Sequence, residues 1–496
     1  MKKFTGLVVL LAALVLGSYY GMGYLTEKKV KESLNVVNQA NGISAELQQY
    51  KRGWFTSDAI LNWRLHVPEH AATAADGQTK TIPAEDYQMQ MPVTIHHGPV
   101  IFADNGVKFG FGYAHTEVPL PAKYSQQFKE LFTSESTEPK LDLSLLVSYL
   151  NNTNVDMSVP AFKLFAKQGN GQLDWLGMTS STNVSSNLDK VDGNITVDGM
   201  RFTKDQVNTT LSAITSEYNL HKTNLGFFLG DASLSFPSLI VMNNDKKLFE
   251  MSQLNLHSDS DVEGGLFSSH FKSSVEKVVA NDKTYGPGNI DIAIRNLDAD
   301  VLAKLNAQLN QAQQGSDTDR QRAMLAMLPE LPQLFSKGPE FEISEMNFVV
   351  PEGKIEGNLM ISLPKGDLGN PFALMQKIQG NGKIKVPATV LKEVIGESIR
   401  QKLSAPQTIQ QGIVQQMQQQ ANQAAGVNPS TSTQVVTADP AAVSQQAVAL
   451  TDKQLSAMVE SGLLTMQGND YVVELNLNQG QLMVNGKPFS PAMMKF

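Results

Sequence analysis

Apolar and polar residues alternate along much of the chain between residues 43 and 365. The longest alternating runs lie at residues 43–47, 59–67, 107–113, 290–294 and 355–361. A period of two places successive side chains on opposite faces of a strand, so these runs predict half-buried β-strands. Asn, Gly and Asp residues separate the runs, as tight turns between antiparallel strands require. The pattern predicts a mainly β fold with helical insertions (α+β), built on an extended antiparallel sheet.

Three Pro-containing segments each open a similar group of strand-like runs. They are Val159-Pro160, Phe236-Pro237 and Gly338-Pro339, and alternating residues follow each of them. Their spacing is irregular, which argues against a regular solenoid. We therefore predict β-meander units that form an irregular internal repeat along the sheet.

Helical periodicity replaces the alternation in a few places. Residues 298–313 and 387–403 carry apolar side chains three and four positions apart, which predicts amphipathic helices. Near the C-terminus, Thr451 and Gln454 form a capping box that predicts the start of a helix. Alternation then returns and predicts a hairpin that ends at the turn pair Asn485-Gly486.

These patterns divide the chain into five predicted segments. The fourth is rich in Ser, Thr, Ala and Gln and almost free of charge, which is typical of a flexible linker. The segments are an N-terminal membrane helix (1–25), a β-rich exported domain (26–365), a helical Gln-rich segment (366–427), the linker (428–450) and a C-terminal helix with a β-hairpin (451–496).

The N-terminal segment carries Lys2 and Lys3, and residues 4–24 after them contain no charge. A charge-free run of about 20 residues is long enough to span a membrane once as a helix. A cleaved signal peptide is the alternative, but the tyrosines at 19, 20 and 24 suit a membrane–water interface better than a cleavage site. We predict an uncleaved signal-anchor in a bacterial inner membrane, with the bulk of the chain in the periplasm.

Two glycines of this segment, Gly17 and Gly21, form a G-x-x-x-G pair. Glycines at this spacing let two membrane helices approach closely. They are therefore candidate residues for a contact between membrane helices, and they give one reason to expect a homodimer.

Composition removes several classes of function. Of the 496 residues, 40 are Lys or Arg and 48 are Asp or Glu, so the net charge is −8 and gives no overall attraction to nucleic acid. The chain has no cysteine, which excludes disulfides, thiolate metal sites, iron–sulfur clusters and cysteine nucleophiles. We expect no nucleic-acid partner.

Three weak motifs resemble parts of metal-binding or catalytic sites. His96 and His97 are adjacent, so in a strand they point to opposite faces and cannot readily share a metal. Residues 259–264 match half of a calcium-binding loop, but the twelfth position is His270 instead of a glutamate. Residues 274–277 match S-x-x-K without the partner motifs of penicillin-recognising enzymes. We therefore predict no catalytic residues, no metal site and no cofactor.

Four short motifs, taken in order, resemble those of a known family. They are Lys51-Arg52-Gly53-Trp54-Phe55-Thr56-Ser57, His96-His97-Gly98-Pro99, Gly480-Gln481-Leu482 and Val484-Asn485-Gly486-Lys487-Pro488. With the basic start and the single apolar segment, they resemble the YdgA-like family of bacterial envelope proteins, a family of unknown function. The resemblance implies an exported, membrane-anchored and self-associating protein of a Gram-negative bacterium. It implies no catalytic residues.

The motif residues are predicted to have structural or recognition roles. Arg52 and Trp54 are either a recognition site or part of an aromatic core pair with the arginine stacked over it. His97 is expected to bond to the backbone near a turn, so that its replacement by Ala is mild. The remaining positions are predicted backbone corners or neighbours of them: Gly53, Ser57, Gly98, Pro99, Asn485, Gly486 and Pro488.

Three functions are compatible with these observations. The first is a non-enzymatic scaffold or self-associating module that binds an envelope protein. The second is a lipid-handling protein, because a long sheet of alternating strands can form a trough with an apolar inner face; this rests on analogy with other envelope proteins. The third is a hydrolase whose site has no recognisable motif. An apolar groove would favour lipid, whereas a sheet covered by its helices would favour the scaffold.

Overall fold

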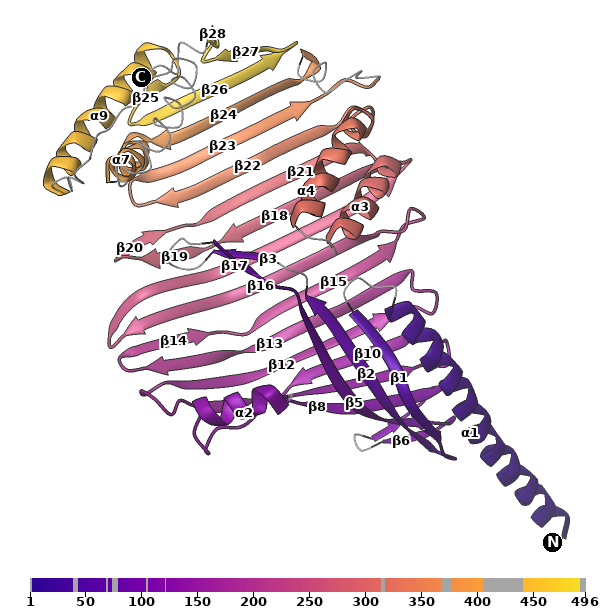
Figure 1. Cartoon of the computed structure of the whole chain (residues 1–496). Coiled ribbons are helices and arrows are strands. Elements are labelled where there is room, and N and C mark those ends of the chain that lie inside the picture. Colours follow the sequence, from indigo (N-terminus) through magenta and orange to yellow (C-terminus); the bar gives the residue numbers. More distant parts are fainter. Residues whose placement is uncertain are drawn as a thin grey trace, which may run out of the picture. The chain divides into compact units, whose positions relative to one another are not determined.

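The computed structural model describes the chain except residues 1, 39–42, 68–69, 74–78, 104–105, 121, 314–316, 367–375, 405–439 and 491–496. The described chain is mainly β with a few helices, as the alternation predicted. It divides into two compact units, and Figure 1 labels the helices and strands along the chain. The first contains residues 1–341 and 362–374, and the second contains residues 342–361 and 375–496.

The N-terminus is a single helix, α1 (Lys2–Val37), which continues past residue 25, the predicted end of the membrane helix, into the segment that was predicted to be β-rich. Within the described residues, no helix combines the length and the apolarity that a membrane crossing needs. Most of the predicted span, residues 2–14, lies outside the residues whose side chains are described. The later part of α1 packs against β1 (Ile43–Arg52), β5 (Glu85–His97) and β8 (Gly112–Pro119).

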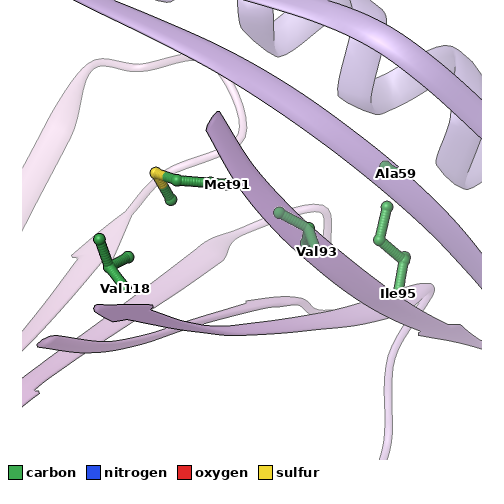
Figure 2. Packing of buried hydrophobic residues seen from close by; sticks show 5 residues of the cluster. All are labelled: Ala59, Met91, Val93, Ile95 and Val118. Carbon is green, nitrogen blue, oxygen red and sulfur yellow. The ribbon is translucent and has the colours of Figure 1, made fainter. Parts of the chain in front are cut away.

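The strands that face α1 are antiparallel neighbours in the order β1, β2 (Thr56–Val67), β5, β8, β9 (Lys140–Val147) and β10 (Thr153–Val159). Alternate residues of these strands turn toward the helix and form a buried cluster of Ala59, Met91, Val93, Ile95 and Val118. Figure 2 shows how β5 contributes three of these side chains, with Ala59 on the neighbouring strand. This cluster is the core on which α1 rests.

Beyond β10 the sheet of the first unit continues antiparallel through long strands. They are β12 (Gln172–Val184), β13 (Lys190–Lys204), β15 (Ile214–Lys222), β16 (Phe228–Asn243), β17 (Lys246–Glu263), β18 (Leu266–Val275) and β21 (Gly288–Asp298). Shorter strands extend or flank it: β3 (His70–Thr73), β4 (Thr79–Ile82), β6 (Ile101–Ala103), β7 (Gly106–Lys108), β11 (Phe162–Phe165), β14 (Val207–Leu211), β19 (Lys277–Ala280) and β20 (Lys283–Tyr285).

Helices in the first unit are few. α2 (Ala122–Leu131) precedes β9, and α3 (Ala299–Gln313), α4 (Asp317–Met327), η1 (Leu328–Glu330) and α5 (Leu331–Leu334) follow β21. The predicted helix at 298–313 is confirmed by α3. Its buried side chains Val301 and Leu305 pack with Met327 and Leu334 in a second core cluster.

The second unit combines strands with two packed helices. Its elements are most of β22 (Glu340–Val350), β23 (Gly353–Ser362), β24 (Gln379–Pro387), α7 (Ala388–Ser404), α9 (Pro440–Glu460), β25 (Thr465–Gln467), β26 (Asp470–Asn478), β27 (Gln481–Val484) and β28 (Lys487–Pro488). The prediction of a helical segment is wrong at β24. This part of the chain is a strand because it pairs with β26 along its length.

The C-terminal part of this unit differs in part from what the sequence predicted. The capping box at Thr451 is wrong, because α9 begins at Pro440 and the buried Thr451 hydroxyl donates to the carbonyl of Ala447 inside the helix. Residues 405–439, which are the last part of the predicted Gln-rich segment and the first part of the predicted linker, lie outside the described residues. The rest of the predicted linker, 440–450, is wrong as a linker because it is the first half of α9. The predicted C-terminal hairpin is present as β26 and β27.

Candidate functional site

A cavity of about 750 Å³ lies between α1 and the inner face of the strands that it covers. Its lining is almost entirely apolar and comes from α1, β2, β5, β8, β9, β10 and the turn before β10. The apolar residues include Leu25, Val30, Leu34, Leu61, Trp63, Val93, Ile95, Ala114, Leu143, Leu145 and Val155. Among the lining residues that the structure describes, Lys29 is the one that carries a charge.

The cavity is present because small side chains lie opposite larger ones on the paired strands. Ala114 of β8 lies opposite Ile95 of β5 and Leu145 of β9, and Ala59 of β2 lies opposite Val93. Side chains directly across two strands share a face, so a small residue at each of these positions leaves space beneath α1. The alternation that predicted the strands therefore also makes the inner face apolar.

Trp63 adds one polar group to this apolar space. Its indole Nε1 is buried and finds no hydrogen-bond acceptor among the described residues. A buried donor without an acceptor costs about 1–3 kcal/mol, so such groups are rare in folded proteins. The indole can donate to an oxygen atom of a molecule that enters the cavity.

The motif around Arg52 holds α1 against the sheet. The guanidinium lies over the rings of Tyr20 and Tyr24, 4.9 and 5.6 Å from their centroids, and pairs with Glu27 at 3.4 Å. Trp54 packs on Tyr20 with ring centroids 5.4 Å apart. Arg52 therefore stacks on the tyrosines of α1, and Trp54, 57% exposed, is not the buried aromatic partner that one interpretation predicted.

His97 and Ser57 form a buried polar pair beside the same helix. Each is 1% exposed, and His97 Nε2 lies 3.0 Å from the Ser57 hydroxyl. His97 Nδ1 lies 3.3 Å from the carbonyl oxygen of Tyr19, which assigns the proton to Nδ1 and leaves Nε2 to accept from Ser57. Burial lowers the pKa of His97 below its usual value of 6.5, although backbone hydrogen bonds oppose the shift.

This pair replaces the predicted turn contact of His97. His97 is the last residue of β5, and its ring lies against α1. A Cβ on Gly23 of α1 would lie 2.6 Å from the His97 ring. Sequence reasoning missed Tyr19 and Gly23 as its partners, because helix and strand are about 80 residues apart in the chain. The predicted separation of the two histidines is observed: His96 instead packs against Tyr113.

The predicted backbone corners differ in their physical basis. Gly98 has φ of +135°, and a Cβ there would lie 2.0 Å from the Tyr19 ring. Gly53 has no left-handed φ, but a Cβ there would lie 2.6 Å from the carbonyl oxygen of Thr56, to which the Gly53 N–H donates. The carbonyl of Pro99 accepts a hydrogen bond from the Tyr149 hydroxyl.

The other predicted motif residues lie elsewhere. Asn485 and Gly486 form the turn between β27 and β28 in the second unit, and Pro488 pairs with Met483 there. The Asn485 side chain accepts from the N–H of Glu474 and donates to the carbonyls of Gly462 and Leu463. Gly17 and Gly21 lie on α1, and a Cβ on either would meet no atom within 4 Å.

The inner face of the sheet continues the lining of the cavity. Paired residues on this face form a row through Ala114, Leu145, Val155, Thr182, Gly193, Tyr218, Ala232, Ser258, Phe271 and Ile292. Its apolar members beyond β10 are half-buried or exposed. The opposite face carries polar and charged residues, among them Asp192, Asn219, Asp231, Asp259 and His270. The sheet is therefore amphipathic.

The weak motifs have no site geometry around them. Asp259 and Asp261 lie inside β17, so the half-match to a calcium loop is a strand. Residues 274–277 cross from β18 into β19. Among the described residues, no group of three or more His, Asp or Glu side chains is placed to hold a metal ion.

A known protein family matches nearly the whole chain. A family model described as "Bacterial protein of unknown function (DUF945)" matches residues 1–492. No curated protein matches the chain.

Proposed function

Since the chain belongs to the DUF945 family of bacterial proteins of unknown function, we propose that it is a membrane-anchored protein of the cell envelope that holds the acyl chain of a lipid beneath α1. The observation that carries the proposal is the apolar cavity of about 750 Å³. Pockets for small ligands commonly measure about 300–1,000 Å³, and a cavity lined by apolar groups admits apolar molecules more readily than water.

Two further features support a lipid over another apolar ligand. The unpaired indole N–H of Trp63 can donate to an ester or carboxyl oxygen, which a lipid carries at one end of its acyl chain. Val155 and Met157 of β10 pair with Leu145 and Leu143 of β9 and carry the apolar inner face to the strand beyond β9, which offers a surface on which an acyl chain can extend. These features support lipid handling over the scaffold function, because the inner face remains partly exposed.

The apolar segment at residues 4–24 and the resemblance to YdgA-like envelope proteins support the anchor and the periplasmic location.

One observation favours the hydrolase alternative. Ser57 and His97 are hydrogen-bonded, and a serine beside a histidine is the residue pair of a nucleophile and its general base. Both side chains are 1% exposed, so a substrate cannot reach the hydroxyl in this conformation. The proposal therefore contains no catalytic step.

The test uses a phospholipid with a photoreactive diazirine in its acyl chain, incorporated into vesicles that contain the full chain. Crosslinks should map to the peptides of β8 and β9. Ala114→Phe fills the cavity and should remove most of these crosslinks. His115→Phe adds a ring on the exposed side of the same strand and should leave them unchanged. Equal crosslinking in wild type and Ala114→Phe, with both proteins folded, would contradict acyl-chain binding.

A further inference from the structure

Five exposed aromatic side chains lie around the place where α1 leaves the sheet. We call them the aromatic collar: Tyr20, Trp54, Phe55, Phe102 and Phe109, which are between 46% and 70% exposed. Aromatic residues of this size are rarely left in water as a group, and contiguous exposed apolar surface commonly marks an interaction site.

Trp54 and Phe55 contact tyrosines of α1 directly, and a hydrogen bond from α1 reaches the residue before the β6–β7 hairpin that carries the other two. Trp54 packs on Tyr20, and Phe55 meets Tyr19 edge-on with ring centroids 4.9 Å apart. The Tyr19 hydroxyl donates to the carbonyl oxygen of Val100 at 2.5 Å, immediately before β6. Phe102 lies on β6, which pairs with β7, and Phe109 follows β7. Figure 1 shows α1 continuing past these strands toward its N-terminus.

The length of α1 before the collar limits how far the collar can stand from a membrane. The charge-free run begins at Phe4, and Tyr19 already packs against Gly98. About 15 residues lie between these points, or ~22 Å at ~1.5 Å per residue. A bilayer has a hydrocarbon core of about 30 Å. A helix this short can cross only if the collar is drawn into the bilayer surface.

The collar also lies close to the opening of the cavity. Tyr149 and Leu150 line the cavity and are exposed at the same time, so they mark its mouth. The Tyr149 hydroxyl donates to the carbonyl of Pro99, next to the Val100 carbonyl that Tyr19 uses. A membrane in contact with the collar would therefore lie close to the cavity mouth.

We infer that the aromatic collar sits in the headgroup layer of a lipid bilayer and brings the cavity mouth to the membrane surface. Tyrosine and tryptophan are enriched at this depth because each ring joins an apolar body to a polar group. The inference rests on the membrane anchor of the proposed function. It adds a second, peripheral contact that fixes how the first unit faces the bilayer.

The test measures the depth of Trp54 in vesicles of phosphatidylcholine and phosphatidylglycerol that contain brominated phosphatidylcholine. The chain has three tryptophans, so Trp63→Phe with Trp175→Phe leaves Trp54 as the fluorescent group. The matched control, Trp54→Phe with Trp63→Phe, leaves Trp175, which stacks on Phe162 of β11. We expect the bromines to quench Trp54 and not Trp175. Vesicle flotation of the same samples reports whether the chain is in the membrane.

Each outcome separates the inference from the function on which it rests. If the chain floats with the vesicles but Trp54 is not quenched, the collar is not in the headgroup layer and the anchor still stands. Equal quenching of Trp54 and Trp175 also overturns the inference, because the contact is then not specific to the collar. If the chain does not float, the membrane anchor fails, and the collar inference fails with it.

Discussion

Single residues without a bulky side chain set how closely α1 approaches the sheet. Gly23 of α1 lies against the ring of His97, and Gly98, which follows β5, lies against the ring of Tyr19 on α1. Each side of this contact therefore supplies one glycine and one ring. A methyl group at either glycine would occupy space that the ring fills. The resulting close packing places Tyr19 and His97 among the buried residues of the chain.

Gly98→Ala should destabilise the first unit by about 1–3 kcal/mol, because the added methyl overlaps Tyr19 and the residue has a left-handed φ. Gly106→Ala is the matched control: its φ is +117°, but an added Cβ meets nothing within 4 Å. Denaturant unfolding should therefore show a larger loss for Gly98→Ala. Equal losses would mean that backbone strain alone, and not the contact with α1, makes Gly98 necessary.

His97 should make stability depend on pH in a defined direction. Burial depresses its pKa in the folded protein below the unfolded value of 6.5, so the unfolded state binds the proton more tightly. The contribution of neutral, buried His97 to the stability of the folded protein is therefore fully present above pH 6.5 and is lost as the pH falls below it. Arg52 and His96 add to the shift through their charge.

Unfolding free energies at pH 7 and pH 5 check this, with His97→Asn as the comparison. The wild type should lose more stability than the variant over this interval. The variant should also be less stable at pH 7, since the buried ring and its two hydrogen bonds are lost. The sequence alone predicted a mild effect of replacing His97, whereas its burial and hydrogen bonds predict a larger one. An identical pH dependence in both proteins would contradict the buried neutral state.

At the scale of elements, a buried carboxylate joins two strands of the sheet. Glu250 of β17 is 6% exposed and accepts hydrogen bonds from Lys277 of β19 at 2.6 Å and from Ser252 at 3.0 Å, and it also pairs with Lys247. The bonds from the two lysines lower the pKa of Glu250 to about 2. β19 is a short strand that pairs with β17 over four residues, and this contact adds a side-chain link to that ladder.

Glu250→Gln should lower stability at pH 7 by about 1–3 kcal/mol, because two lysines lose a charged acceptor. The folded pKa lies below the usual value of 4.5, so the contribution of Glu250 is present above pH 4.5 and disappears as the pH falls toward 2. The difference between wild type and variant should shrink over that interval. Glu263→Gln, at the exposed end of β17, serves as the control and should change little.

Two roles predicted for α1, the membrane anchor and the helix–helix contact of a homodimer, remain predictions. Gly17 and Gly21 present an open face, as a helix–helix contact would require, and a homodimer through them is untested. The same helix carries the predicted membrane span at its start and the lining of the cavity near its end. The predicted anchor and the wall of the cavity are therefore parts of one continuous helix.

At the scale of the whole molecule, strands outnumber helices and much of the apolar side-chain surface is only half-buried. A sheet with one charged face and one apolar face needs a second layer or a ligand to cover its apolar side. α1 supplies that layer over β1, β2, β5 and β8, and the cavity lies beneath it.

The sequence by itself determined the mainly β fold, the helix α3 and the turn at Asn485-Gly486. Each of these depends on local periodicity or on backbone preferences that neighbouring residues specify. The same local reasoning failed for β24 and for the start of α9, because strand pairing and helix packing overrode the local pattern.

Only the tertiary structure decided the candidate site. Leu61, Ile95, Ala114 and Leu145 come from four strands and Val30 from a helix, and no spacing in the chain reveals that they line one cavity. Their alternation indicated an apolar face, and the small residues Ala59 and Ala114 were the available signals that the face leaves space. The cavity exists because antiparallel register aligns small and large side chains across strands, and register is a property of pairing between distant segments.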